Sequence, residues 1–72
     1  MQNKMQQAIE MSQREIITLA ETKLGRQLTD GERGGIGRIS SLMMLESICR
    51  SFTAPGYTAA QVLADLEHFA SQ

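Results

Sequence analysis

Apolar residues recur at helical spacing on almost every side of the segment from Ile36 to Phe52. At about 100° per residue they form three stripes instead of one. The stripes are Leu42, Leu45, Cys49 and Phe52; Ile36, Ile39 and Met43; and Met44 and Ile48. A helix that covers one face of a small domain needs a single stripe, whereas a helix that is apolar on several sides must be buried on several sides. The pattern therefore predicts a helix with neighbours on both flanks, one of which could be a second copy of the chain.

A long amphipathic helix is predicted before this segment, from Asn3 to Leu24. Its apolar positions share one face and are Met5, Ile9, Ile16, Leu19, Ala20 and Leu24. Gly25 follows at the position where a glycine usually ends a helix, because it adopts left-handed backbone angles without strain. Lys23 stands in the last turn, where a cation is favoured by the helix dipole.

The second helix is predicted to run from Thr29 to Thr53. Thr29 and Glu32 have the spacing of a capping box, in which each side chain bonds to the backbone N–H of the other residue. Pro55 and Gly56 then stop the helix, because proline disfavours helical angles in the residue before it. At 1.5 Å per residue the second helix would be roughly 37 Å long, which suits an antiparallel hairpin with the first helix.

The third helix is predicted from a second capping box at Thr58 and Gln61 to about Ser71. Its apolar face consists of Ala59, Val62, Leu63, Leu66, Phe69 and Ala70. The expected fold is all-α: a single domain over residues 1–72, with the third helix folded back across the hairpin. Two copies are expected to pair through the surplus apolar surface of the second helix, because closed two-fold dimers are the commonest oligomers.

Composition narrows the possible functions. The 72 residues contain one cysteine, Cys49, and one histidine, His68, so no internal disulfide and no metal site is expected. The net charge of −1 argues against a generic binder of polyanions. No signal peptide is recognised, and no apolar run approaches the roughly 18 residues of a membrane span. A cytoplasmic protein without a cofactor is therefore expected.

Four glycines crowd the start of the second helix: Gly31, Gly34, Gly35 and Gly37. They lack the Gly-Lys-Ser/Thr ending of a phosphate-binding loop and the spacing of a dinucleotide fingerprint. Two structural interpretations remain. The glycines allow a close approach of the first helix or of a partner, or they leave the first turns frayed, since glycine costs about 1 kcal/mol against alanine in a helix. The capping box favours close approach.

Chemistry for catalysis is sparse. Cys49 lies on an apolar stripe, where a small buried thiol is the simplest interpretation, and His68 lies near the end of a helix, where the dipole favours it. No third group orients either residue, so the protein is not expected to be an enzyme. Among the methionines, Met5 and Met43 are expected in the core, whereas Met11 and Met44 fall off the main stripes and are candidates for an intermolecular surface.

These patterns predict a non-enzymatic protein-interaction module, such as an adaptor, an inhibitor or a regulatory subunit, that acts through an apolar helical surface. The candidate surface consists of Ile36, Leu42, Met43, Met44, Leu45 and Ile48. The alternative is a small dimeric regulator that contacts nucleic acid through the basic turn between the first two helices. That turn carries Lys23, Arg26, Arg33 and Arg38, partly offset by Asp30 and Glu32.

Overall fold

Each helix of the protein begins at a polar side chain that caps it. The computed structural model describes residues 3–71, and the helices in this range are α1 (Lys4–Leu24), α2 (Asp30–Gly37), α3 (Leu42–Thr53) and α4 (Ala59–Ala70). The capping side chains are Asn3, Thr29, Ser41 and Thr58, each of which accepts a hydrogen bond from the backbone N–H three residues later. Both predicted capping boxes form, Gly25 ends α1 with φ 70°, and the predicted all-α class is confirmed.

The long second helix predicted from Thr29 to Thr53 is instead two helices, so the expected count of three is wrong. The chain leaves α2 after Gly37, and α3 begins only at Leu42. A local cause is visible at Ser41, whose Oγ accepts the backbone N–H of Met44 at 3.3 Å and so starts a new helix. The glycines of α2 also weaken a continuous helix. The apolar stripes of this segment therefore belong to two helices with different neighbours.

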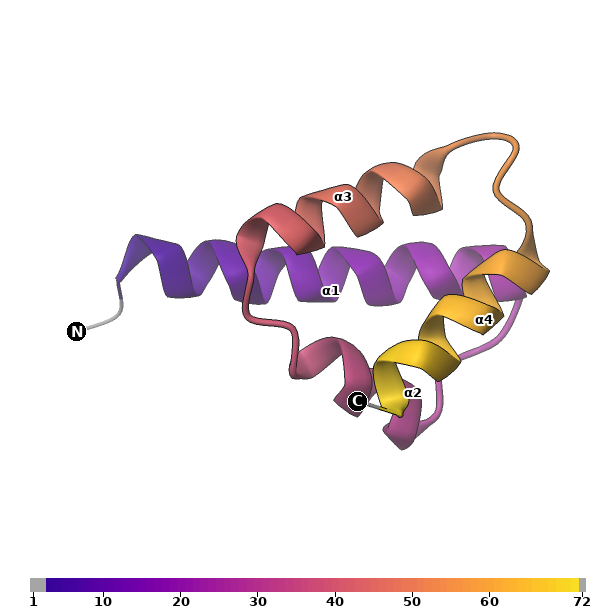
Figure 1. Cartoon of the computed structure of the whole chain (residues 1–72), viewed down its shortest axis with the longest axis horizontal. Coiled ribbons are helices and arrows are strands. Elements are labelled where there is room, and N and C mark those ends of the chain that lie inside the picture. Colours follow the sequence, from indigo (N-terminus) through magenta and orange to yellow (C-terminus); the bar gives the residue numbers. More distant parts are fainter. Residues whose placement is uncertain (1–2, 72) are drawn as a thin grey trace.

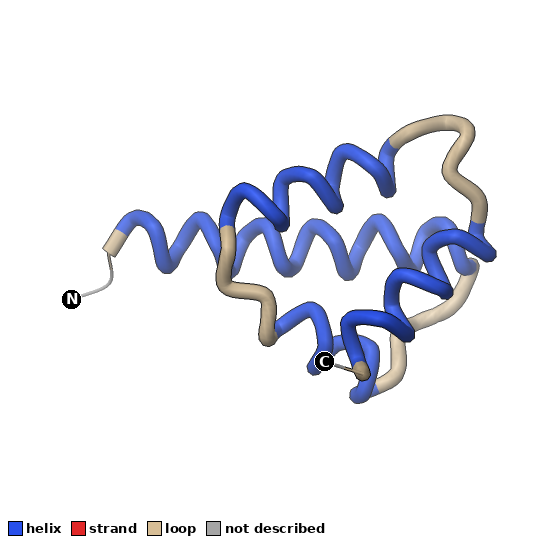
Figure 2. The backbone as a smooth tube through the Cα atoms, viewed as in Figure 1, coloured by secondary structure: helices blue, strands red, loops and turns tan. Residues whose placement is uncertain are grey.

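The break also changes the direction of the chain (Figures 1 and 2). The backbone N–H of Leu28, just before α2, donates to Glu21 late in α1, and Gly37 at the end of α2 accepts from Gln13, so α2 runs antiparallel to α1. Gln13 also donates to the carbonyl of Ile39 at 2.8 Å, before α3 begins. Lys23 donates at 3.2 Å to the carbonyl of Ala54, after α3 ends. The predicted antiparallel hairpin thus holds for α2, whereas α3 runs parallel to α1.

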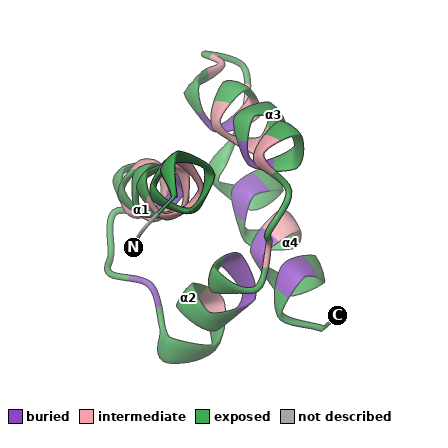
Figure 3. Cartoon of the chain, turned by 90° about the vertical axis from the view of Figure 1, so that its left-hand side faces the viewer, coloured by how far each residue is buried: buried purple, intermediate pink, exposed green. Residues whose placement is uncertain are grey.

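The core lies where all four helices meet, and Figure 3 shows the buried positions turned toward the interior. Its residues are Ile16, Ala20, Leu28, Ile36, Leu45, Phe52, Val62, Leu66 and Phe69. Ile36 and Leu45 both reach this core, but from α2 and α3 respectively. Much of the apolar surface from which a second copy was predicted is therefore already covered within one chain.

The glycine cluster performs one packing role, at Gly35. A Cβ built on Gly35 would lie 2.9 Å from the backbone nitrogen of Ala70 and 3.0 Å from the carbonyl carbon of Phe69. The close approach predicted for the glycines is therefore real at this position, but the approaching element is the end of α4 instead of α1. Around Gly34 and Gly37 a Cβ would meet no such crowding.

Candidate functional site

Exposed apolar side chains gather around the first turn of α3, which we call the α3 tip (Leu42, Met43 and Met44). Met43 is 82% exposed and Met44 is 43% exposed, whereas Leu42 is half-buried. Met43 was expected in the core and is instead the most exposed large apolar residue of residues 3–71. The reason is that α3 buries the face that carries Leu45 and Phe52, and Met43 lies on a different face, which is exposed to solvent.

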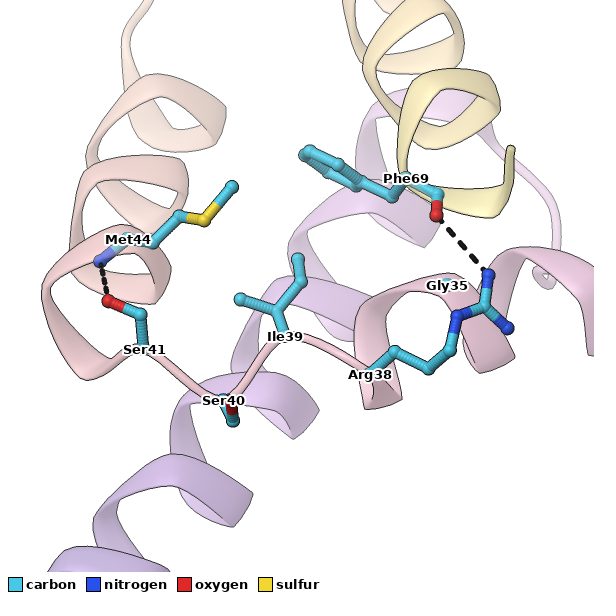
Figure 4. A pocket seen from close by; sticks show the side chains of 7 residues that line it. All are labelled: Gly35, Arg38, Ile39, Ser40, Ser41, Met44 and Phe69. Carbon is cyan, nitrogen blue, oxygen red and sulfur yellow. Dashed lines mark hydrogen bonds between the residues drawn. The ribbon is translucent and has the colours of Figure 1, made fainter. Parts of the chain in front are cut away.

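A hollow of about 360 Å³ lies on one side of the α3 tip, and Figure 4 shows its lining. The residues that line it are Gly35, Arg38, Ile39, Ser40, Ser41, Met44 and Phe69. The side chains of Ile39, Met44 and Phe69 converge on the space between α3 and α4. We call this space the α3–α4 hollow. Its floor is apolar, because the guanidinium of Arg38 turns away to the end of α4.

Arg38 is held in that position by two backbone carbonyls. Its Nη2 donates to the oxygen of Phe69 at 3.3 Å and to the oxygen of Ala70 at 3.1 Å. These carbonyls end α4, where no intrahelical N–H remains to bond them and where the helix dipole favours a cation. The side chain thus joins α2 to α4 beside the close contact at Gly35.

A second depression of about 490 Å³, which we call the α1–α3 groove, lies on the other side of the α3 tip. Its lining consists of Ala8, Met11, Ser12 and Glu15 from α1 with Leu42 and Glu46 from α3. Met11 is 68% exposed. The ion pairs formed within residues 3–71 are Arg26–Glu32 and Arg33–Glu21, so the carboxylates of Glu15 and Glu46 are not neutralised there.

The two carboxylates of the groove affect the pKa of the Cys49 thiol. The Sγ atom lies 4.0 Å from the Oε2 of Glu15 and 4.0 Å from the carbonyl oxygen of Ser12. Partial burial raises the pKa of Cys49, and the negative charges of Glu15 and Glu46 raise it further. The thiol is therefore protonated at neutral pH and is a poor nucleophile.

The structure separates the predicted interaction surface into two groups. The α3 tip is accessible, and Ile48 is half-buried against the core. Ile36 and Leu45 are 0% exposed and serve as core residues, so they cannot meet a partner while the chain is folded. This follows from the break before α3, which gives the two parts of the segment separate buried faces.

The exposure of the other methionines was predicted only in part. Met11 and Met44, proposed for an intermolecular surface, each line one of the two depressions. Met5 is 57% exposed instead of buried, because it lies in the first turns of α1, which project beyond the other helices (Figure 1). Sequence reasoning did not select Glu15 or Glu46; the heptad-like spacing of Ala8, Met11 and Glu15 was the signal that could have found this side of α1.

The side chains of the predicted basic surface form contacts within the chain. Arg26 forms two hydrogen bonds with the carboxylate of Glu32, at 2.9 and 3.0 Å. These bonds, together with one from the backbone of Thr29, lower the pKa of Glu32 to about 2. The Nη2 of Arg33 lies 3.8 Å from the Oε2 of Glu21.

The remaining two cations of that surface, Lys23 and Arg38, connect distant segments of the chain. Lys23 donates to the carbonyl oxygens of Ala54 at 3.2 Å and of Tyr57 at 2.8 Å, which fastens the connection between α3 and α4 to the end of α1. Arg38 fastens α2 to α4 as described above. All four predicted cations thus have a partner within the chain.

The two residues with catalytic potential, Cys49 and His68, lie on different helices, α3 and α4. Cys49 contacts α1, whereas His68 lies on α4 with its ring 6.3 Å from that of Phe69. No group of three or more histidine, cysteine, aspartate or glutamate side chains in residues 3–71 is arranged to hold a metal ion. In the same range no helix has both the length and the apolar character needed to cross a bilayer.

Comparison with family models, with curated proteins and with solved structures finds no match for this chain. The function is therefore inferred from the surfaces described above. The α3 tip with its two depressions is the candidate site, since it joins the exposed apolar side chains of α3 to the two hollowed regions beside it.

Proposed function

We propose that this protein is a non-enzymatic interaction module that binds a protein partner through the α3 tip and the α3–α4 hollow. The observation that carries the proposal is the exposure of Met43 and Met44 beside an apolar hollow. Methionine side chains are flexible and polarisable, so they suit contact surfaces that adapt to a partner. Such a module would act as an adaptor, an inhibitor or a regulatory subunit.

The energetics favour an apolar contact at this place. Burying a methionine side chain completely is worth about 1.5–3 kcal/mol, and Met43 has most of its surface still in water. The hollow offers Ile39 and Phe69 as an apolar floor for a partner side chain. A partner helix that places apolar residues against Met43 and into the hollow would use the helix-in-groove mode of recognition.

The alternative function, contact with nucleic acid through the basic turn, gains no support from the geometry. A phosphate contact requires a cation that can turn to the ligand, and each of the four predicted cations is engaged within the chain. The alternative stays a prediction, and the experiment below includes an outcome that would favour it. Self-association to a homodimer likewise stays a prediction, separate from the binding of a protein partner.

The test is affinity capture of the tagged whole chain from extracts of its native host, carried out with and without nuclease and with washing at low and at high salt. The variant Met43→Asp/Met44→Asp places charge on the α3 tip. Met5→Asp is the matched control, because it makes the same chemical change at another exposed methionine. Circular dichroism first establishes that both variants are folded, and mass spectrometry then quantifies the proteins retained.

We expect at least one protein to be retained equally by the wild type and by Met5→Asp, and to be reduced at least about ten-fold for the α3 tip variant, which corresponds to about 1.4 kcal/mol. Identical sets of retained proteins for all three chains would contradict the proposal. Capture that disappears with nuclease and with Arg26→Glu/Arg33→Glu would favour the nucleic-acid alternative instead.

A further inference from the structure

The N-terminal half of α1 carries a seam of four residues, of which Lys4, Met11 and Glu15 are exposed and Ala8 is half-buried. Lys4, Ala8, Met11 and Glu15 follow one another at intervals of four, three and four residues, which is the spacing of the contact positions in a coiled coil. Ala8, Met11 and Glu15 line the α1–α3 groove. The first turns of α1 project beyond the other three helices (Figures 1 and 2).

The seam is complementary to itself when it is reversed. If a second α1 lies antiparallel to the first, Lys4 faces Glu15 of the second copy, and Ala8 faces Met11 of the second copy. A two-fold axis repeats each contact, so the arrangement gives two ion pairs and two pairings of a small side chain with a large one. A parallel arrangement would instead set Lys4 against Lys4 and Glu15 against Glu15, which selects the antiparallel direction.

We infer that a second copy of this chain occupies the α1–α3 groove, through antiparallel pairing of the N-terminal halves of two α1 helices. Met11 of the second copy then lies in the groove of about 490 Å³, against Ala8 and Leu42. Lys4 of the second copy lies beside Glu15 and Glu46, neither of which forms an ion pair within residues 3–71. The chain itself thus supplies the positive charge that complements these carboxylates. In the antiparallel pair, Lys4 of one copy lies at the level of Glu15 of the other.

This surface differs from the one first expected for a dimer. The dimer was predicted through the residues between Ile36 and Ile48, but the break before α3 buries the centre of that segment in the monomer. The α1–α3 groove shares only Leu42 with the α3 tip. A dimer formed through α1 therefore leaves Met43 and Met44 accessible to a different protein, and the inference does not depend on the proposed function.

The seam is short, and it buries less than the roughly 1,600 Å² of a standard interface. We expect a dimer with a dissociation constant on the order of 10–100 µM. Sedimentation equilibrium of the whole chain, measured from well below to well above this range, gives the constant directly. Met11→Asp should weaken dimerisation by at least about ten-fold, because each copy would bury a carboxylate in the partner's groove. Met43→Asp, which lies outside the seam, should leave it unchanged.

A charge exchange tests the direction and the pairing of the helices. Lys4→Glu alone and Glu15→Lys alone each bring two pairs of like charges together, so each should weaken dimerisation by about ten-fold at low salt. An equimolar mixture of the two variants restores both opposite pairs and should form a heterodimer as tightly as the wild type. The double variant Lys4→Glu/Glu15→Lys should likewise regain the homodimer.

The matched controls make the same changes of charge outside the seam. Arg33→Glu lies exposed on α2, and Glu67→Lys lies exposed on α4. Neither should weaken the dimer as its counterpart in the seam does. The inference is overturned if the wild type is monomeric at the highest concentration, or if the mixture of the two seam variants associates no more tightly than either variant alone.

Discussion

Replacement of Gly35 by alanine measures how tightly α2 crosses the end of α4. The added Cβ would lie 2.9 Å from the nitrogen and 3.1 Å from the Cα of Ala70, and 3.0 Å from the carbonyl carbon of Phe69. All three are backbone atoms, which cannot rotate away as a side chain can. The end of α4 must shift to admit the methyl group, and this shift would disturb the buried ring of Phe69 and the hydrogen bonds from Arg38.

Two opposing effects determine the size of the change. Overpacking of a tight contact costs about 1–3 kcal/mol. Alanine in place of glycine within a helix contributes about 1 kcal/mol of stability. Gly35→Ala should therefore lower the free energy of unfolding by up to about 2 kcal/mol, in spite of the better helix former that it introduces.

Gly34→Ala is the matched control, one residue earlier in the same helix. A Cβ at Gly34 would have as its nearest neighbour the Nη1 of Arg38, at 3.9 Å, so the methyl group fits without strain. This variant should be stabilised by up to about 1 kcal/mol. The gain in helix propensity is common to both variants, so it cancels when their free energies of unfolding are subtracted. The remaining difference, about 1–3 kcal/mol, is the cost of the contact between Gly35→Ala and α4.

Thermal and urea unfolding followed by circular dichroism, at one low protein concentration, would measure this difference. For a chain of this size about 4–8 °C corresponds to 1 kcal/mol, so the melting temperatures of the two variants should differ by about 10 °C. If Gly35→Ala proves as stable as Gly34→Ala, Gly35 does not mark a close helix crossing, and the glycines mark a frayed turn.

Two further predictions concern titratable groups. Hydrogen bonds from Arg26 lower the pKa of Glu32 from 4.5 to about 2, so the carboxylate stabilises the fold fully above about pH 5 and loses this contribution as the pH falls toward 2. Glu32→Gln should accordingly be less stable than the wild type at pH 7 in urea denaturation, and the gap should close near pH 2; a gap independent of pH would argue against the ion pair. Burial raises the pKa of Cys49, so iodoacetamide at pH 8 should modify it several-fold more slowly in the folded chain than in urea. Glu46→Gln should speed the folded reaction, and equal rates in the folded and unfolded chain would contradict the assignment.

The helix ends that depend on near neighbours were predicted correctly from the sequence. Thr29 and Thr58 form their capping boxes, and Gly25 ends α1 in the left-handed conformation. Each of these features involves residues no more than four positions apart, so the local sequence contains the whole interaction. The all-α class followed from the same signals.

The candidate site was predicted only in part. The residues of the α3 tip were selected because they are apolar and lie off a single stripe, but Ile36 and Leu45 were selected with them and are buried. The N-cap at Ser41 was a local signal that could have separated the two groups. The continuous apolar pattern was instead interpreted as one long helix, although two consecutive helices can produce the same pattern.

The sequence by itself determined that this chain forms capped amphipathic helices, because capping and periodicity act within a few residues. Only the tertiary structure decided that α2 and α3 run in opposite directions along α1, that Gly35 touches α4, and that Met43 faces the solvent. These features depend on contacts between residues about thirty positions apart, such as Lys23 with Ala54 and Arg38 with Ala70. Local propensity carries no information on such contacts, since they form only after the helices have packed and each has a defined buried face.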